Sequence, residues 1–381
     1  MKRVERIREI SRNMTYTSEV DDEIRKRFDF PKVELHLHLD GAIRHQTLLD
    51  LSIEKKIDLK GVTTVDEVRD IVVTREPSNL SKMLEPFDLF LPVLAGDKDA
   101  IERIAYELCE DEAENGVIYF EARYSPQLLC NTVRNTAANS KYGIYAKKGQ
   151  LDPRGVIEAV RRGFLRGEKE FGVKARSILC CIHGFHDWND EVLELATNLS
   201  SEGVVGIDIA GCSLGADEQY PPSVLELYQE AAKRGIHRTV HAGESGGAKE
   251  VINAIEEMQA ERIGHGYRLL RDECAYKKYA VKKRIHFEAC PLSSVMTGSV
   301  PLLWSEHPVK RFAADDINFS LSTDDPTCFN NSLLSEHQLA YQEIGLTKKQ
   351  LWKCSLNAAR SCFAEESLKS EIIAIIEKAE V

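Results

Sequence analysis

The chain has 381 residues, of which 43% are hydrophobic and 29% are charged. This composition is that of a globular protein with a large core, and it excludes a disordered or fibrous chain. The formal charge is −11, from 50 basic and 61 acidic residues, which disfavours a broad phosphate-binding surface and therefore nucleic acid as a partner.

Neither export nor membrane insertion is expected from the sequence. The first thirty residues mix charges of both signs and contain no apolar core of a signal peptide. The longest apolar runs, such as residues 178–182 and 372–376, are far shorter than the ~20 residues of a membrane helix. The ten cysteines are scattered without a C-x-x-C pair, as expected for reduced thiols in a cytoplasmic protein.

Short β-like runs alternate along the chain with helical patterns, which is typical of a parallel sheet built from βα units. Helical periodicity marks residues 100–114, 155–171, 223–234, 247–258 and 271–283. The predicted strands cover residues 32–38, 117–123, 175–182, 203–209, 237–241, 262–265, 284–289 and 317–322. Eight such strands predict an α/β protein with a (β/α)₈ TIM barrel.

No linker or repeat divides the sequence, so we expect a single domain over residues 1–381. Three segments exceed a plain barrel: a charged lead-in at 1–30, inserted helices after the first strand at 46–96, and terminal helices at 347–380. Residues 127–151 are expected to form a loop over one end. Barrel enzymes build their active sites from loops at the C-terminal ends of the strands, so we expect the chemistry there.

The first predicted strand carries a polar stripe. Odd positions from Val33 to Leu39 are aliphatic, whereas Glu34, His36, His38 and Asp40 share the other face. A half-exposed strand would show the same alternation. In a closed barrel, however, neither face meets free water, and inward-facing polar groups need partners that a cation can supply.

The last predicted strand repeats this pattern. Asp324 falls on the same stripe as Ser320 and Ser322, and Asp325 is expected on the opposite face. The Asp-Asp-Pro sequence is also compatible with an ordinary loop. Because the first and last strands are neighbours in a closed barrel, Asp324 is expected beside His36.

Two further histidines, His241 and His265, end predicted strands among small residues. With His36, His38 and Asp324 they place four imidazoles and a carboxylate at one end of the barrel, and some subset is expected to bind a metal ion such as zinc. Glu244, three residues beyond His241, is placed to transfer a proton, although a carboxylate at a helix N-terminus is the alternative. His265 and Asp325 could hold or deprotonate a water molecule.

Five segments, residues 32–41, 121–126, 239–244, 262–267 and 322–326, closely resemble in order the motifs of the adenosine deaminase family. The resemblance spans about residues 30–365. It implies a metal-dependent hydrolase with a (β/α)₈ barrel and one Zn²⁺ per subunit. The implied reaction is the hydrolytic deamination of adenosine and 2′-deoxyadenosine to inosine and 2′-deoxyinosine with release of ammonia, a step of purine metabolism.

The resemblance also implies roles for individual residues. The implied zinc ligands are His36, His38, His241 and Asp324. Glu244 would protonate the purine ring nitrogen beside the reacting carbon, while His265 and Asp325 would hold and activate the attacking hydroxide. The implied substrate contacts are Asp40 with the ribose, the backbone N–H of Gly211 with the purine, and an apolar wall of Leu80, Met83, Leu84 and Phe87.

Two details of these contacts stay open. The spacing of the apolar wall also fits a plain core stripe. In addition, Cys212 and Ser213 stand where the family usually shows an acidic pair, which leaves the details of that loop open.

Other readings are less well supported. A relative acting on adenine, AMP or N6-methyl-AMP is the nearest, but residues 40–41 and 293–298 offer no lysine or arginine for a phosphate. A binuclear amidohydrolase would carry a lysine at the end of the fourth strand, which 206–209 lacks. A catalytically inactive barrel would have lost one of the residues above. We expect a cytoplasmic monomer that binds a small nucleoside, with no nucleic-acid or membrane partner.

Overall fold

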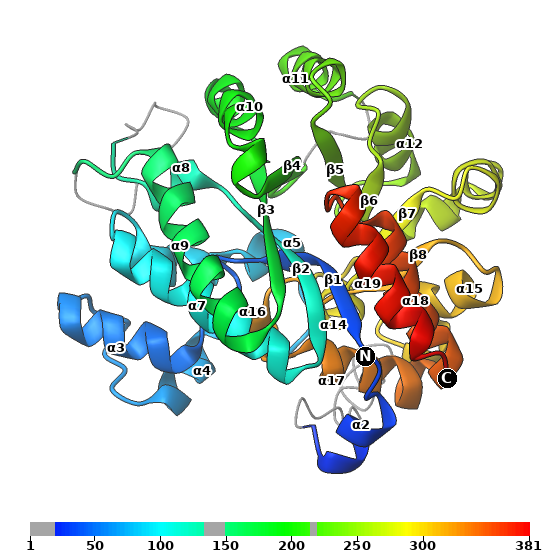
Figure 1. The fold of residues 1–381 in the computed structure, drawn as a ribbon, viewed down its shortest axis with the longest axis horizontal. Coiled ribbons are helices and arrows are strands. Elements are labelled where there is room, and N and C mark those ends of the chain that lie inside the picture. The colour runs from blue at the N-terminus through cyan, green and yellow to red at the C-terminus, as the bar shows by residue number, and fades with distance from the viewer. Residues whose placement is uncertain (1–19, 133–148, 214–218) are drawn as a thin grey trace, which may run out of the picture.

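The computed structural model describes residues 20–132, 149–213 and 219–381, and Figure 1 shows its strands in the middle of the molecule with helices around them. Eight strands form one sheet in the order β1 to β8, and each pairs in parallel with the next. They are β1 Lys32–His38, β2 Val117–Tyr124, β3 Lys174–Ile182, β4 Val204–Ala210, β5 His237–Ala242, β6 Arg262–His265, β7 His286–Ala289 and β8 Phe319–Leu321. The predicted (β/α)₈ barrel is confirmed.

The barrel closes between β1 and the segment that follows β8. Leu37 forms a parallel bridge with Asp324. The backbone N–H of His38 donates to the carbonyl of Asp324 at 2.9 Å, and the N–H of Asp324 donates to the carbonyl of His36 at 3.1 Å. Closure therefore brings the polar residues of the first strand beside Asp324, as the sequence predicts.

Three predicted strands begin later than expected, and a residue with a positive backbone φ stands at or just before the predicted start of each. Gly203 has φ 96°, so β4 begins at Val204. Arg284 has φ 53°, and β7 begins at His286. Asp316 also has φ 53°, and β8 extends only from Phe319 to Leu321. A left-handed residue turns the chain out of the extended conformation that a strand requires.

Most predicted helices agree with the structure, although the pattern at 271–283 is interrupted. Four are α7 Lys98–Glu114, α9 Pro153–Phe171, α11 Pro222–Lys233 and α12 Ala248–Glu256. The fifth becomes a 3₁₀ turn at Tyr267–Arg271, helix α13 at Glu273–Tyr276 and a π turn at Lys277–Lys282. The helices α10 Asn189–Asn198 and α15 Pro308–Ala314 were not predicted, because both are short and their apolar patterns are weak.

The additional helices lie in the expected segments. The segment at 46–96 holds α3 His45–Lys55, α4 Val65–Val72, α5 Leu80–Met83 and α6 Glu85–Leu94, and the C-terminal segment holds α18 Lys348–Ser361 and α19 Glu366–Lys378. Shorter elements are α2 Asp22–Arg27, α8 Pro126–Leu129, α14 Pro291–Met296, α16 Pro326–Phe329, α17 Leu333–Leu339, the π turn Ala340–Ile344, and 3₁₀ turns at His186–Trp188, Ser200–Glu202 and Trp304–Glu306. Most of the expected lead-in and loop, residues 1–19 and 133–148, lies outside the described residues.

Backbone hydrogen bonds fix the inserted helices over the C-terminal end of the barrel. The N–H of Ser78 donates to the carbonyl of Met296, and the N–H of Thr74 donates to the carbonyl of Cys328, both at 2.8 Å. Met296 and Cys328 belong to helices that follow β7 and β8. The insertion therefore covers the end of the barrel where the predicted site lies.

Candidate metal and catalytic site

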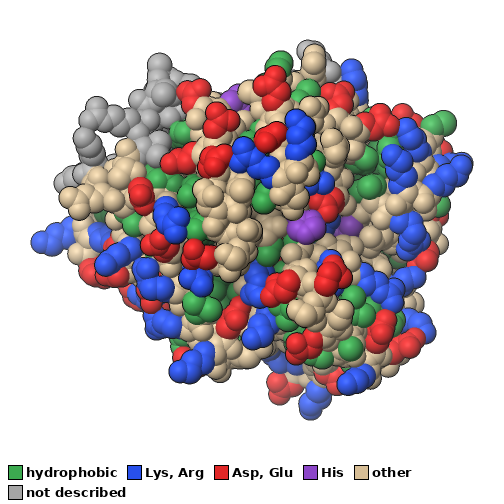
Figure 2. Space-filling model, turned by 45° about the horizontal axis from the view of Figure 1, so that its top comes forward, with side chains coloured by type: hydrophobic (Ala, Val, Ile, Leu, Met, Phe, Trp, Pro, Cys, Tyr) green, Lys and Arg blue, Asp and Glu red, His purple; other side chains and the backbone are tan. Residues whose placement is uncertain are grey.

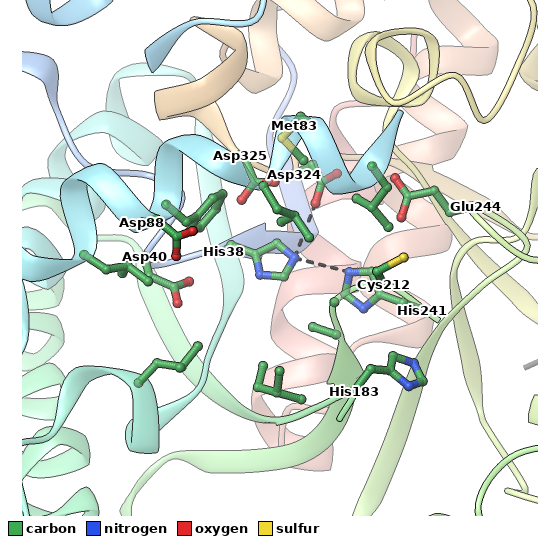
Figure 3. Close-up of a pocket in the computed structure, with 18 of the residues that line it drawn as sticks. His38, Asp40, Met83, Asp88, His183, Cys212, His241, Glu244, Asp324 and Asp325 are labelled. Carbon is green, nitrogen blue, oxygen red and sulfur yellow. Dashed lines mark hydrogen bonds and ion pairs between the residues drawn. The ribbon is translucent and has the colours of Figure 1, made fainter. Parts of the chain in front are cut away.

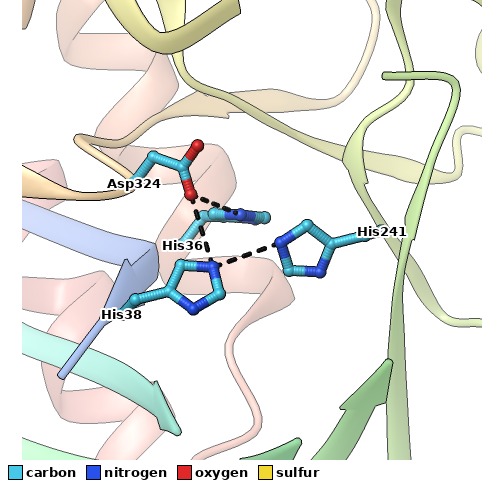
Figure 4. Close-up of side chains that lie close together, drawn as sticks. All are labelled: His36, His38, His241 and Asp324. Atoms are coloured by element: carbon cyan, nitrogen blue, oxygen red, sulfur yellow. Dashed lines mark hydrogen bonds and ion pairs between the residues drawn. The ribbon is translucent and has the colours of Figure 1, made fainter. Parts of the chain in front are cut away.

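The four implied metal ligands come together at the C-terminal end of the barrel. One ligand atom from each of His36, His38, His241 and Asp324 lies within 4.8 Å of all the others (Figure 4). The Oδ1 atom of Asp324 is 3.2 Å from Nε2 of His36 and 3.4 Å from Nε2 of His38. The Nε2 atoms of His38 and His241 are 3.2 Å apart.

Buried carboxylates orient two of these imidazoles. Nδ1 of His36 lies 2.7 Å from Oε2 of Glu288, and Nδ1 of His241 lies 2.8 Å from Oδ2 of Asp208. A carboxylate at Nδ1 keeps the proton on that nitrogen and leaves the Nε2 lone pair directed toward the cluster. Burial also lowers the pKa of His241 to about 4, so its ring is neutral, as a metal ligand must be.

A single buried arginine links the two orienting carboxylates. The guanidinium of Arg123 lies 2.7 Å from Asp208 and 2.7 Å from Glu288, and all three side chains are fully buried. Burial alone would raise the pKa of Glu288, but Arg123 and Arg262 hold it well below its usual value. Both carboxylates therefore stay ionised beneath the histidines.

These residues fit a divalent cation. Nε2 of His36 is buried and makes no hydrogen bond within the described structure. Nε2 of His38 and Nε2 of His241 are 3.2 Å apart, so one cation beside them is within reach of both nitrogens. Three imidazole nitrogens and one carboxylate form an N/N/N/O donor set without thiolate, which suits zinc.

The turn after β8 differs from its sequence-based prediction. Asp324 has φ 69°, which ends the two-residue alternation of the strand, and both Asp324 and Asp325 line the same pocket. Asp325 therefore does not lie on the opposite face, as the alternation predicted. The turn is held by Glu34, whose Oε1 accepts hydrogen bonds of 2.6 Å from the N–H and from the hydroxyl of Thr323.

A glycine in β6 makes room for one ligand. A Cβ atom on Gly264 would lie 2.6 Å from Cε1 of His36, closer than side-chain carbons approach each other. The next residue, His265, has φ 64°, and its ring centroid is 4.7 Å from that of His36. Gly264 thus lets the histidines of β1 and β6 share the barrel end.

The two expected proton-transfer groups lie beside the cluster. Nε2 of His265 is 3.6 Å from Oε2 of Glu244 and 3.8 Å from Oδ2 of Asp324. Burial and the charge of Asp324 raise the pKa of Glu244 to about 8, so its carboxyl holds a proton at neutral pH. Burial lowers the pKa of His265 well below its usual value, which leaves a neutral ring that can accept a proton.

One pocket is lined by three residues of this cluster, His38, His241 and Asp324, and by the expected substrate contacts (Figure 3). Gly211 has φ 93°, which a side chain would disfavour, and it follows β4 at the pocket wall. All the remaining predicted contact residues also line this pocket: Asp40, Leu80, Met83, Leu84 and Phe87. Leu80 and Met83 are also buried in the core, as the core-stripe interpretation of this spacing expects, and their contact with a substrate stays a prediction.

Sequence reasoning missed several residues at or beneath the pocket. His183, Cys212 and Asp88 line it, and Cys212 lies 3.6 Å from the hydroxyl of Ser81 on α5. Asp208 and Glu288 were missed as supports of the ligands. The sequence could have indicated both residues, because a charged side chain inside a buried parallel strand needs a partner.

The histidines given no site role have ordinary structural settings. His237 lies 2.8 Å from Glu261, His286 lies within hydrogen-bonding distance of Asn318 and Ser320, and Nδ1 of His337 lies 2.8 Å from the carbonyl of Leu333. All ten cysteines are free thiols. None of the described helices has the length and apolar character to cross a membrane.

The chain was compared with known proteins. The family model for adenosine deaminase matches residues 31–379. Adenosine deaminase of Danio rerio is 42% identical over 346 residues, which is 91% of this chain and 94% of the relative. Adenosine deaminase of Bos taurus is 41% identical over 92% of this chain and 95% of the relative.

Solved structures share the fold. The N6-mAMP deaminase of Arabidopsis superposes with a TM-score of 0.76 at 27% identity, covering 93% of this chain and 99% of that protein. The adenine deaminase of Arthrobacter aurescens superposes with a TM-score of 0.76 at 23% identity, covering 92% and 99%.

Proposed function

The chain belongs to the adenosine deaminase family, and on that premise we propose that it catalyses the zinc-dependent hydrolytic deamination of adenosine and 2′-deoxyadenosine. The observation that carries the proposal is the convergence of His36, His38, His241 and Asp324, with Glu244 lining the same pocket as His38, His241 and Asp324.

His36, His38, His241 and Asp324 would hold one Zn²⁺. When bound, zinc supplies Lewis-acid chemistry that makes a neighbouring water molecule much more acidic than bulk water. The support for this assignment is the donor set, the buried Nε2 of His36 3.2 Å from Oδ1 of Asp324, and the carboxylates that orient His36 and His241.

The protein groups would carry the protons of the reaction. Glu244, protonated at neutral pH, donates to the purine ring nitrogen next to the carbon that bears the amino group, which makes that carbon electrophilic. His265 and Asp325 hold and activate the attacking water, and the neutral ring of His265 accepts its proton. The water oxygen bonds to the ring carbon, the proton held by His265 passes to the amino group, and the carbon–nitrogen bond breaks with release of ammonia.

The rest of the pocket would bind the nucleoside. Asp40 accepts a hydrogen bond from a ribose hydroxyl, and the N–H of Gly211 donates to the purine. The apolar side chains Leu84 and Phe87 cover the base and exclude water from the reacting carbon. In Figure 2, acidic and basic side chains are interspersed over the face in view, which suits an uncharged substrate better than a polyanion.

A substrate panel tests the proposal. The purified, zinc-loaded chain is incubated with adenosine, 2′-deoxyadenosine, adenine, AMP and N6-methyl-AMP, and deamination is followed by ultraviolet absorbance. We expect conversion of the two nucleosides with kcat/KM at least about a hundredfold above the others, a preference of about 3 kcal/mol. Preferred turnover of adenine or of a nucleotide would overturn the proposal.

We further propose that the enzyme works as a cytoplasmic monomer with all of residues 1–381 in one domain. The free thiols support a reducing compartment. Light scattering of the active protein measures the mass, and a dimer would contradict this part of the proposal.

A further inference from the structure

Helix α6 places a charged side chain at the mouth of the pocket. Leu84, Phe87 and Leu91 line the pocket with the i, i+3, i+7 spacing of one helix face. Asp88 lines the same pocket although this part of α6 is otherwise apolar, and its side chain is exposed to solvent. An exposed carboxylate that lines a pocket acts directly on the charge of a molecule that enters it.

A second carboxylate lies on the same side of the pocket. Asp40 is buried just beyond β1 and lines the pocket with Asp88. In Figure 3 both lie on the side of His38 away from Glu244. No lysine or arginine occurs among the described residues that line the pocket.

The two ends of the pocket thus differ in chemistry. Under the proposed function, the purine reacts at the end where Glu244 and His265 lie. The remainder of the substrate therefore extends toward Asp40 and Asp88, and in a nucleotide the phosphate is the group farthest from the base. A phosphate would meet negative charge there, and repulsion between like charges disfavours its binding.

We propose that Asp88 is a specificity-determining residue that excludes 5′-phosphorylated substrates by charge. The inference rests on the proposed function and deepens it, because it assigns the preference for nucleosides over nucleotides to one side chain at the pocket mouth. Asp40 is engaged by the sugar in any substrate, whereas Asp88 faces the group that distinguishes adenosine from AMP.

The test compares kcat/KM for AMP with kcat/KM for adenosine in the wild type and in Asp88→Asn and Asp88→Lys. The ratio does not depend on the fraction of protein that is folded. We expect it to rise about five- to tenfold in Asp88→Asn and by a further similar factor in Asp88→Lys. Asp99→Asn is the matched control, because it removes one exposed carboxylate at the start of α7, away from the pocket, and its ratio should equal that of the wild type.

The dependence of the AMP to adenosine ratio on salt distinguishes electrostatic repulsion from a steric effect. Raising the ionic strength from about 0.02 M to about 0.5 M shortens the screening length from roughly 20 Å to roughly 4 Å. The AMP to adenosine ratio should then rise in the wild type and rise less in Asp88→Asn. A ratio that rises in the variants without any salt dependence would show a steric effect and overturn the proposal.

The experiments distinguish a failure of the proposed function from a failure of the role assigned to Asp88. If the wild type converts adenosine but the ratio is unchanged in both Asp88 variants, the proposed function stands and the role of Asp88 is wrong. If the zinc-loaded wild type prefers AMP or does not convert adenosine, the proposed function is wrong and the inference fails with it.

Discussion

Replacing Glu244 by glutamine gives the sharpest test of the proton-transfer assignment. The amide has nearly the same shape as the carboxyl group but can neither donate a carboxyl proton nor take one back. Glu244 is not one of the four implied metal ligands, and its Oε2 atom lies 3.6 Å from Nε2 of His265, so the metal ligands should keep their positions. The variant therefore separates proton transfer from metal binding.

The expected loss of kcat follows from the protonation state of the Glu244 carboxyl group. With a pKa of about 8, about nine-tenths of Glu244 is protonated at pH 7, the form that donates to a ring nitrogen. General acid catalysis contributes about 10²- to 10⁴-fold, and we expect Glu244→Gln to lose kcat by that factor. Wild-type kcat should also fall on the alkaline side with a midpoint at or below about pH 8, because a bound cation stabilises the ionised form.

The assay follows adenosine absorbance at saturating substrate, with zinc content measured by elemental analysis and folding by circular dichroism. The variant should hold as much zinc as the wild type and show the same spectrum. Retention of more than about a tenth of wild-type kcat under these conditions would refute the role of Glu244 as proton donor.

Two further predictions concern the support of the site, and a third concerns the pH dependence of folding. Gly264→Ala should displace the ring of His36 and weaken zinc binding, measured by competition with a chelating dye, while the thermal midpoint falls by only a few degrees; unchanged affinity would remove the argument from close approach. Asp208→Asn should weaken zinc binding about 10- to 100-fold, because the carboxylate at Nδ1 of His241 strengthens that ligand, and equal affinity would contradict it. Burial lowers the pKa of His337 to about 3, so the unfolded chain binds a proton that the folded chain excludes, and stability should fall by about 1.4 kcal/mol per pH unit from about pH 6.5 toward pH 3. The difference between the urea midpoints at pH 7 and pH 5 should thus be smaller in His337→Gln than in the wild type. An equal difference in the two proteins would show that His337 does not titrate.

Alternation along the strands accounts for what could be predicted of the fold and the metal cluster. Odd positions of the first strand from Val33 to Leu39 are buried, and His36 lies inside the barrel with Glu34, because a closed sheet has only two faces. The C-terminal ends of parallel strands meet at one end of a barrel, so His241 and Asp324 could be placed beside His36 without knowledge of any distance.

Local backbone angles and strand register explain which features of the site the alternation pattern could not predict. The φ of 69° at Asp324 breaks the alternation and brings Asp325 into the same pocket, and a two-residue period cannot foresee such a turn. Likewise, Arg123, Asp208 and Glu288 come from three different strands, so their mutual contacts depend on strand register. Asp88 was missed because a polar residue on a surface helix is ordinary until the pocket beside it is known.

Zinc titration of the metal-free protein measures whether deamination of adenosine depends on a bound metal ion. The purified chain is stripped with a chelator, dialysed and returned to increasing amounts of Zn²⁺, and the rate of conversion of adenosine to inosine is measured at each step. We expect no conversion without metal, and a rate of conversion that rises linearly with added Zn²⁺ to a plateau at one zinc per chain. Conversion that does not depend on metal, or none at full zinc loading, would contradict this expectation.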